Sequence, residues 1–218
     1  MERKIITYSE YFETFYDNQS SELQEKIDWV LEIVKSVEKV SRKIFAYLEN
    51  TDGIYEIRIE FESNIYRILF FFDKRNLVVL INAFTKKTQK TPLKEITKAE
   101  KLKKNILLIN KLLKMKNEKK ISKNKIADWS DKMDTKYGKQ GSETRTNFET
   151  KAQAFYIGEL LKEGRKQAKL TQKQMAEKTG TKKSYISRVE NGHADIQLST
   201  LYKLIEMGLN KKLKLAIT

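Results

Sequence analysis

The chain has 218 residues, 39% of them hydrophobic, and 20 Phe and Tyr residues, which suffices for one large or two small packed domains and excludes wholesale disorder. It has no cysteine and one histidine, which excludes disulfides, thiolate catalysis and Cys-based zinc sites and favours a cytoplasmic location. The net charge of +15 favours a polyanionic partner, although a lysine-rich genome would also raise it. We expect no cofactor, metal or membrane partner.

The first half of the chain predicts a mixture of strands and helices. Residues 3–8 suit a strand, and Ser21 with Gln24 resembles a capping box at the start of a helix. Three runs rich in β-branched and aromatic residues, separated by hairpin-length spacers, predict strands at 54–61, 65–72 and 77–84.

A further helix and a linker are predicted next. Thr91 as N-cap with Pro92 at the first helical position starts the helix, which continues toward Leu113. Residues 115–150 have few apolar anchors, which predicts a linker with a short helix around 126–133. Met115, inside LLKMKNEKKI, resembles the start of a formerly separate protein, or is incidental to a lysine-rich linker.

The chain from residue 151 onward has a helical pattern and carries most of the excess charge. Residues 115–218 hold 23 Lys and Arg against 12 Asp and Glu, compared with 21 against 17 in residues 1–114. Short helices are predicted to begin at Thr171, Lys182 and Leu198, with a turn at Gly180. The alternating end, KKLKLAIT, suits a short strand that pairs between chains.

Residues 170–192 have the sequence pattern of two helices joined by a tight turn. Lys183, Ser184 and Arg188 fall on one outer face of the second helix. The motif TQ-x-x-MA-x-x-x-G-x-x-x-x-x-IS-x-x-ENG resembles the Cro/repressor-like (XRE) helix-turn-helix family over about 157–207. The resemblance implies that these three residues read bases in the major groove and that Arg165 and Glu190 form a structural ion pair. It also implies further DNA contacts from Gln172, Lys182, Tyr185 and Asn191.

Two arginines in the predicted strands stand out because each lies within an apolar run. Arg58 and Arg67 face a cleft or a bound anion, or they pair with acidic residues such as Glu56 on neighbouring strands. The pattern alone leaves both alternatives open.

The segments GIYEIRIEFESNIYRILFFF and LVVLINAFTKKTQKTPLKEITKAEKLKK resemble the HigB branch of the RelE/ParE toxin superfamily, of the phage-derived host-inhibition type. This implies an α+β domain, a twisted antiparallel sheet with helices, and metal-independent, ribosome-dependent cleavage of mRNA. The implied catalytic residues are Arg58, Arg67, Lys86 and Lys87, with Phe84 and Lys90 binding RNA. Glu56 is a candidate base, and the Tyr or His that some relatives place near the toxin end is missing here.

The resemblances together predict a toxin–antitoxin fusion. Its parts are a toxin domain at 1–104, a linker and toxin-contacting segment at 105–150, and an all-α HigA-like antitoxin domain at 151–218. The antitoxin would inhibit the toxin in cis or in trans, bind operator DNA, repress its own operon and form a homodimer. The alternatives are a DNA-binding regulator whose RelE-like domain is inactive and serves oligomerisation or sensing, and a toxin that acts on gyrase.

Six large apolar residues in the otherwise polar segment 121–156, which runs from the predicted linker into the antitoxin domain, are candidates for toxin contact. They either bind the toxin or pack the first helices of the antitoxin itself. They are Trp129, Met133, Tyr137, Phe148, Phe155 and Tyr156.

Overall fold

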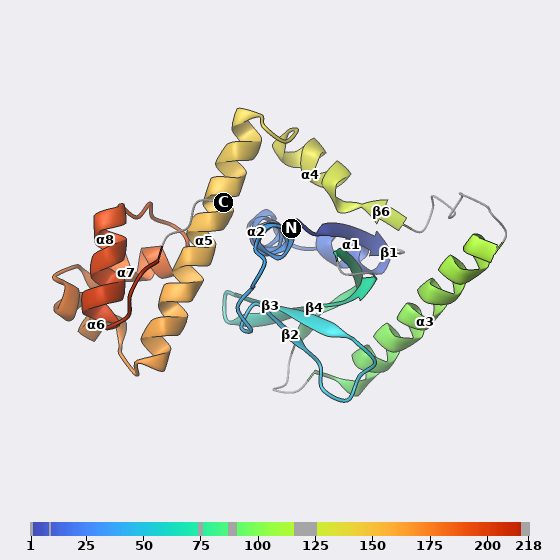
Figure 1. Cartoon of the computed structure of the whole chain (residues 1–218), viewed down its shortest axis with the longest axis horizontal. Helices are drawn as coiled ribbons and strands as arrows, with labels where there is room; N and C mark the ends of the chain where they lie inside the picture. Colours follow the sequence, from blue (N-terminus) through green and yellow to red (C-terminus); the bar gives the residue numbers. More distant parts are fainter. Residues whose placement is uncertain (1, 9, 74–75, 87–90, 116–125, 215–218) are drawn as a thin grey trace. The chain divides into compact units, whose positions relative to one another are not determined.

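The computed structural model describes residues 2–8, 10–73, 76–86, 91–115 and 126–214. They fall into two compact units, Met1–Arg145 and Thr146–Thr218, each described by itself (Figure 1). None of the helices within these ranges combines the length and hydropathy that crossing a membrane requires.

The first unit is built on a single six-stranded sheet with the order β2-β3-β4-β5-β1-β6. All neighbouring strands are antiparallel except β1 and β5, so the sheet is mixed rather than wholly antiparallel. The strands predicted at 3–8, 54–61, 65–72 and 77–84 are confirmed as β1, β3, β4 and β5. The strands are β1 (Lys4–Tyr8), β2 (Phe45–Tyr47), β3 (Tyr55–Phe61), β4 (Asn64–Asp73), β5 (Leu77–Lys86) and β6 (Ile126–Asp128).

Three helices pack on this sheet, namely α1 (Glu10–Asp17), α2 (Ser21–Ser36) and α3 (Leu93–Met115). The helix α1 contacts β1 and β5, α2 contacts β1 and β3, and α3 contacts β4 and β5. Ala99 and Ile106 of α3 are buried against a cluster that includes Leu69 of β4 and Ile81 of β5. Side chains alternate across a strand, so this cluster fixes which residues share the face on which α3 lies.

The predicted capping box of α2 is wrong by one residue. The N-cap is Ser20, whose hydroxyl accepts a hydrogen bond from the backbone N–H of Leu23, and Ser21 is the first helical residue. The amide of Gln24 donates instead to the carbonyl of Tyr16, because α1 ends close to the start of α2.

The stretch predicted as a linker contains regular structure that the sequence pattern did not indicate. The short helix predicted around 126–133 is confirmed in part as α4 (Trp129–Tyr137), whereas residues Ile126–Asp128 form the strand β6 in place of its first turn. Asp128 caps α4, accepting a hydrogen bond from the backbone N–H of Ser130 at 3.1 Å. The strand exists because its backbone pairs with β1, and such a long-range pairing leaves no local periodicity.

The second unit is helical, as predicted. Its core combines Leu161 with Met175, Ile186 and Leu204. The predicted terminal strand is wrong for residues 211–214, which form no strand, and residues 215–218 lie outside the described part of the chain. The helices are α5 (Glu143–Gln167, which begins within the first unit), α6 (Gln172–Thr179), α7 (Lys183–Glu190), α8 (Leu198–Lys203) and a π-helical turn η1 (Leu204–Gly208).

Candidate nucleic-acid interfaces

Three predicted site residues form a row across the sheet of the first unit. Arg58 on β3 lies directly opposite Arg67 on β4, and Arg67 lies opposite Phe84 on β5. Residues in register on neighbouring strands point to the same face of a sheet. The ring of Phe84 packs at the border of the core cluster beneath α3, so it is partly buried.

The carboxylate of Glu56 joins the two arginines. Its Oε1 accepts a hydrogen bond from Arg58 Nε at 2.7 Å, and its Oε2 lies 3.3 Å from Arg67 Nε. The hydroxyl of Thr91 donates to Oε2 at 2.8 Å, so Thr91 does not cap the helix as predicted. Instead, the carbonyl of Pro92 accepts the first helical hydrogen bonds of α3. Of the two alternatives for the arginines, the ion pair with an acidic strand residue is the one present.

The environment of Glu56 argues against its candidate role as a general base. The residue is only 3% exposed, and burial alone would raise the pKa of its carboxyl group. Hydrogen bonds from Thr91 and Arg58 and the charge of Arg67 outweigh burial and lower the pKa overall. An acceptor whose oxygens are already taken and whose pKa is low is a poor proton acceptor, so Glu56 holds the arginines in place.

The basic residues of this face differ in their access to solvent. The side chain of Arg58 is 38% exposed, whereas that of Arg67 is 9% exposed. Lys86, at the end of β5, is half-buried, and its pKa is lowered by burial and then by the positive charges of Arg67 and Arg58, with Glu56 opposing. Lys87 and Lys90 lie outside the described residues.

The helix-turn-helix of the second unit is ordered by local signals. Thr171 and Gln174 form a reciprocal capping box at the start of α6. Gly180 adopts a left-handed conformation with φ of 59°, which ends α6 and makes the turn into α7. Ile186 and Val189 are buried, which fixes the rotation of α7 about its axis.

A buried ion pair ties α7 to α5. The guanidinium group of Arg165 contacts both carboxylate oxygens of Glu190 at 2.5 and 2.8 Å, and it also donates to the carbonyl of Leu170. The hydrogen bonds that Arg165 donates to Glu190 raise the pKa of Arg165, and burial opposes this. The ion pair implied by the family resemblance is therefore present, and Gln172 donates its amide N–H to the same carboxylate at 2.9 Å.

The burial of Ile186 and Val189 leaves a polar face of α7 in solvent. Lys182, Lys183, Ser184 and Arg188 are exposed, and Tyr185 is half-buried. The Asn191 amide donates to the carbonyl of Ser187. The predicted DNA-contacting residues therefore separate into an exposed set on α7 and two amides, of Gln172 and Asn191, whose N–H groups bond within the domain.

Several residues that lie beside the exposed face of α7 were not predicted from the sequence. A groove of about 500 Å³ runs along α7 and is bordered by residues before and within α8. No motif indicated them, because the approach of α8 to α7 is a tertiary contact. The additional lining residues are Thr181, Asp195, Gln197 and Thr200.

Comparisons with known proteins assign both halves of the chain to families. Residues 14–104 match the family described as phage-derived protein Gp49-like (DUF891), and residues 161–207 match a helix-turn-helix family. A matching solved structure is that of the restriction-modification controller protein C.AhdI from Aeromonas hydrophila, at 30% identity over 28% of this chain and 91% of that chain, with a TM-score of 0.27. Among curated proteins, none matches significantly.

Proposed function

Because the chain joins a Gp49-like domain to a helix-turn-helix domain, we propose that it is a toxin–antitoxin fusion. In this proposal the first domain cleaves mRNA on the ribosome. The second half binds operator DNA, represses its own operon and keeps the first domain inactive. The observation that carries the RNA-directed role is the pair of arginines anchored by one buried carboxylate beside Lys86.

The chemistry of this face suits attack of a ribose 2′-OH on the neighbouring phosphate. The step needs an acceptor for the 2′-OH proton, which water or a ribosomal group would supply because Glu56 is a poor base, and stabilisation of the charge that develops on the phosphate oxygens. A guanidinium group provides the second with two parallel donors. Arg58 is exposed and would donate hydrogen bonds to the phosphate. Arg67 is buried and would contribute its positive charge only. Lys86, with its lowered pKa, is suited to donate a proton to the leaving 5′-oxygen.

Expression in growing bacteria, with cleavage of mRNA on translating ribosomes as the second readout, tests this role. The fragment should include residues 1–115 rather than 1–104, because α3 continues to Met115. We expect the whole chain to be tolerated and the fragment to arrest growth and cleave mRNA. Arg58→Ala should abolish both effects, while Lys101→Ala, a change on the exposed side of α3, should leave them intact. A fragment that folds but cleaves nothing would refute the ribonuclease role.

One observation favours the rival function, a DNA-binding regulator with an inactive first domain. Arg67 is almost fully buried and its charge is already met by Glu56, as in a purely structural ion pair. The rival predicts operator binding by the whole chain, together with no RNA cleavage and no growth arrest from the fragment.

The DNA-binding role rests on the exposed face of α7, which by resemblance would enter the major groove. Repression of the chain's own promoter in a reporter strain is the direct measurement. Loss of repression on Arg188→Ala, with the protein still folded, is the expected result.

A further inference from the structure

The segment from β6 to the start of α5, residues 126–145, completes the first unit, packs on β1, α1 and α2, and extends the sheet. Backbone pairing aligns Ile6 with Asp128, Thr7 with Ala127 and Tyr8 with Ile126. A three-residue strand at the end of a sheet is held by what surrounds it rather than by its own propensity. The contacts that hold it therefore come from the residues that follow.

Apolar contacts anchor the segment where α4 begins. The ring of Trp129 packs edge-on against Phe12 and Tyr16, with ring centroids 5.2 and 5.1 Å apart. Trp129 and Met133 are 4% and 3% exposed, so this side of α4 is fully covered. Of the six apolar residues singled out in the sequence, these two are thus buried against the Gp49-like half. Phe155 lies elsewhere, within reach of Gly192 in the second unit.

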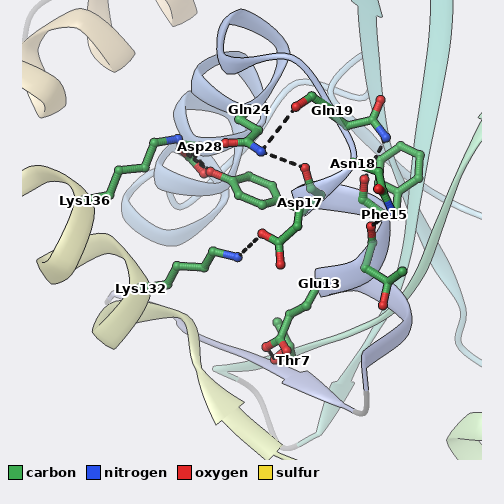
Figure 2. A network of polar contacts seen from close by, with 12 residues as sticks. Thr7, Glu13, Phe15, Asp17, Asn18, Gln19, Gln24, Asp28, Lys132 and Lys136 are labelled. Atoms are coloured by element: carbon green, nitrogen blue, oxygen red, sulfur yellow. Dashed lines mark hydrogen bonds and ion pairs between the residues drawn. The ribbon is translucent and has the colours of Figure 1, made fainter.

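Charged groups meet across the same surface with matched signs. Lys132 contacts Asp17 at 2.6 Å and Lys136 contacts Asp28 at 2.7 Å, as Figure 2 shows. Arg145 contacts Glu32 at 3.3 Å. In these three pairs the acids belong to α1 and α2 and the cations to the segment, and in a fourth pair the signs are reversed, with Lys4 of β1 2.6 Å from Asp128 of the segment. Four charge pairs of matched sign would not arise from a linker that merely rests on the surface.

Of these acids, Asp28 depends most on its hydrogen-bond donors, because it is the most deeply buried. It is completely buried, and one of its oxygens accepts hydrogen bonds from Tyr16, Lys136 and Tyr137 at 2.7–2.8 Å. Burial raises the pKa of Asp28 even with these donors present. Burial also raises the pKa of both tyrosines, which keeps their hydroxyl groups protonated and donating. Two of the three donors are in α4, so the Gp49-like half alone cannot complete this site.

We propose that the surface formed by β1, α1 and α2 is a docking site for residues 126–145, through which the helix-turn-helix half recognises the Gp49-like half as a separate folded partner. The added strand and Trp129 supply affinity, and the pair of buried Asp28 with the partly exposed Lys136 supplies specificity, because a partner without a cation there leaves a buried carboxylate without its counter-charge. This deepens the proposed function by naming the contact between toxin and antitoxin, which residues 126–145 make to the first half of the same chain.

The test measures association and not activity. A protease site is inserted into residues 116–125 of the full chain, the purified protein is cut there, and the affinity between the two parts is measured by sedimentation over a dilution series. We expect the parts to stay together at micromolar concentration. We expect Lys136→Met and Asp28→Asn each to weaken association by about tenfold or more. Lys139→Met, which makes the same change on the exposed turn after α4, should alter affinity by less than about twofold.

A double-mutant cycle separates pairing from misfolding. In the Asp28→Asn background, Lys136→Met should weaken association by less than about threefold, since its partner charge is gone. Thermal unfolding of the uncut variants identifies any that fail to fold. Separation of the unmutated parts at micromolar concentration would overturn the proposal, as would additive effects in the cycle. Neither result depends on RNA cleavage, so a first domain that cleaves no RNA would leave the docking proposal unaffected.

Discussion

Arg58 and Arg67 lie directly opposite each other on neighbouring strands, and both contact the single buried carboxylate of Glu56. Like charges in that position repel each other, so the carboxylate is what permits the arrangement. The side chain that reaches solvent is that of Arg58. Glu56 therefore holds this face together, whereas Arg58 presents its positive charge to solvent. Mutations can separate the two roles.

Glu56→Gln should destabilise the first unit. The substitution removes the carboxylate that contacts both guanidinium groups, and breaking a buried pair is costly. Since Arg58 is partly exposed, we expect a loss of about 2–4 kcal/mol in the free energy of unfolding, measured by urea denaturation. Glu38→Gln, an exposed change of the same kind, should cost less than about 0.5 kcal/mol. Equal losses in the two variants would contradict the assignment.

The contribution of Glu56 to the free energy of unfolding should decrease as the pH falls. Its pKa is lower in the folded state than in the unfolded state, so its stabilisation is fully present above the unfolded-state pKa. That stabilisation is lost as the pH falls through the folded-state pKa, which lies below the ordinary value of a glutamate. The difference in unfolding free energy between the unmutated chain and Glu56→Gln should therefore narrow as the pH falls through the folded-state pKa. A difference that stays constant on acidification would show that the carboxylate charge is irrelevant.

Arg188→Ala should relax the sequence preference of DNA binding. DNA sequences selected from a random pool by the full chain provide the reference site. We expect the substitution to cost about 1–3 kcal/mol at one base-pair position, with little change at the others. Lys182→Ala serves as the contrast, since loss of a phosphate contact weakens all sequences alike and reduces the salt dependence. A uniform loss for Arg188→Ala would identify it as a backbone contact.

Glu190→Gln should loosen the second unit from within. The substitution breaks the buried pair with Arg165 and also affects the hydrogen bond from Gln172. We expect a loss of about 3 kcal/mol in local stability, read from hydrogen-exchange protection of α5 and α7. The exposed pair of Lys173 and Glu177, at 3.9 Å, gives the control, and Glu177→Gln should be nearly neutral. Comparable effects of the two changes would refute the structural role of the buried pair.

Gly158→Ala and Gly164→Ala should differ although both glycines lie in α5. A methyl group at Gly158 would overlap the backbone carbonyl of Val189, which cannot move without shifting α7. At Gly164 it would meet the side chain of Leu209, which can rotate away. We expect Gly158→Ala to cost about 1–3 kcal/mol in hydrogen-exchange protection of α7. For Gly164→Ala, the gain in helix propensity, up to about 1 kcal/mol, should offset most of the cost.

The elements that the sequence predicted well are those whose signals are local. The strand β3 alternates and the strands β4 and β5 are apolar runs bounded by hairpin-length spacers, and the turn at Gly180 needs a left-handed residue at that one position. The same holds for Ile186 and Val189, whose helical spacing alone places them in the core. The predictions were least accurate where a distant partner decides the structure.

Two features illustrate that limit. Glu56 lies on the charged face of β3, which predicts that it is exposed to solvent. The arginines on β3 and β4 nevertheless bury it. Residues 126–128 are too few to show a period, and they form a strand only because β1 offers unpaired backbone groups. The acids Asp28 and Glu32 lie on a strongly amphipathic helix, where nothing local marks them as partners of residues more than 100 positions later.

The position of β6 in the chain has a consequence for synthesis. Residues 1–115 are translated before Ile126–Asp128, so in the nascent Gp49-like half β1 is for a time unpaired on that side and Asp28 lacks its partners Lys136 and Tyr137. A translation product that ends early carries both features permanently. An open strand of this kind is prone to pair with other chains, and chaperones and proteases act on such products. The order of the two halves along the messenger thus makes each incomplete copy a substrate for quality control.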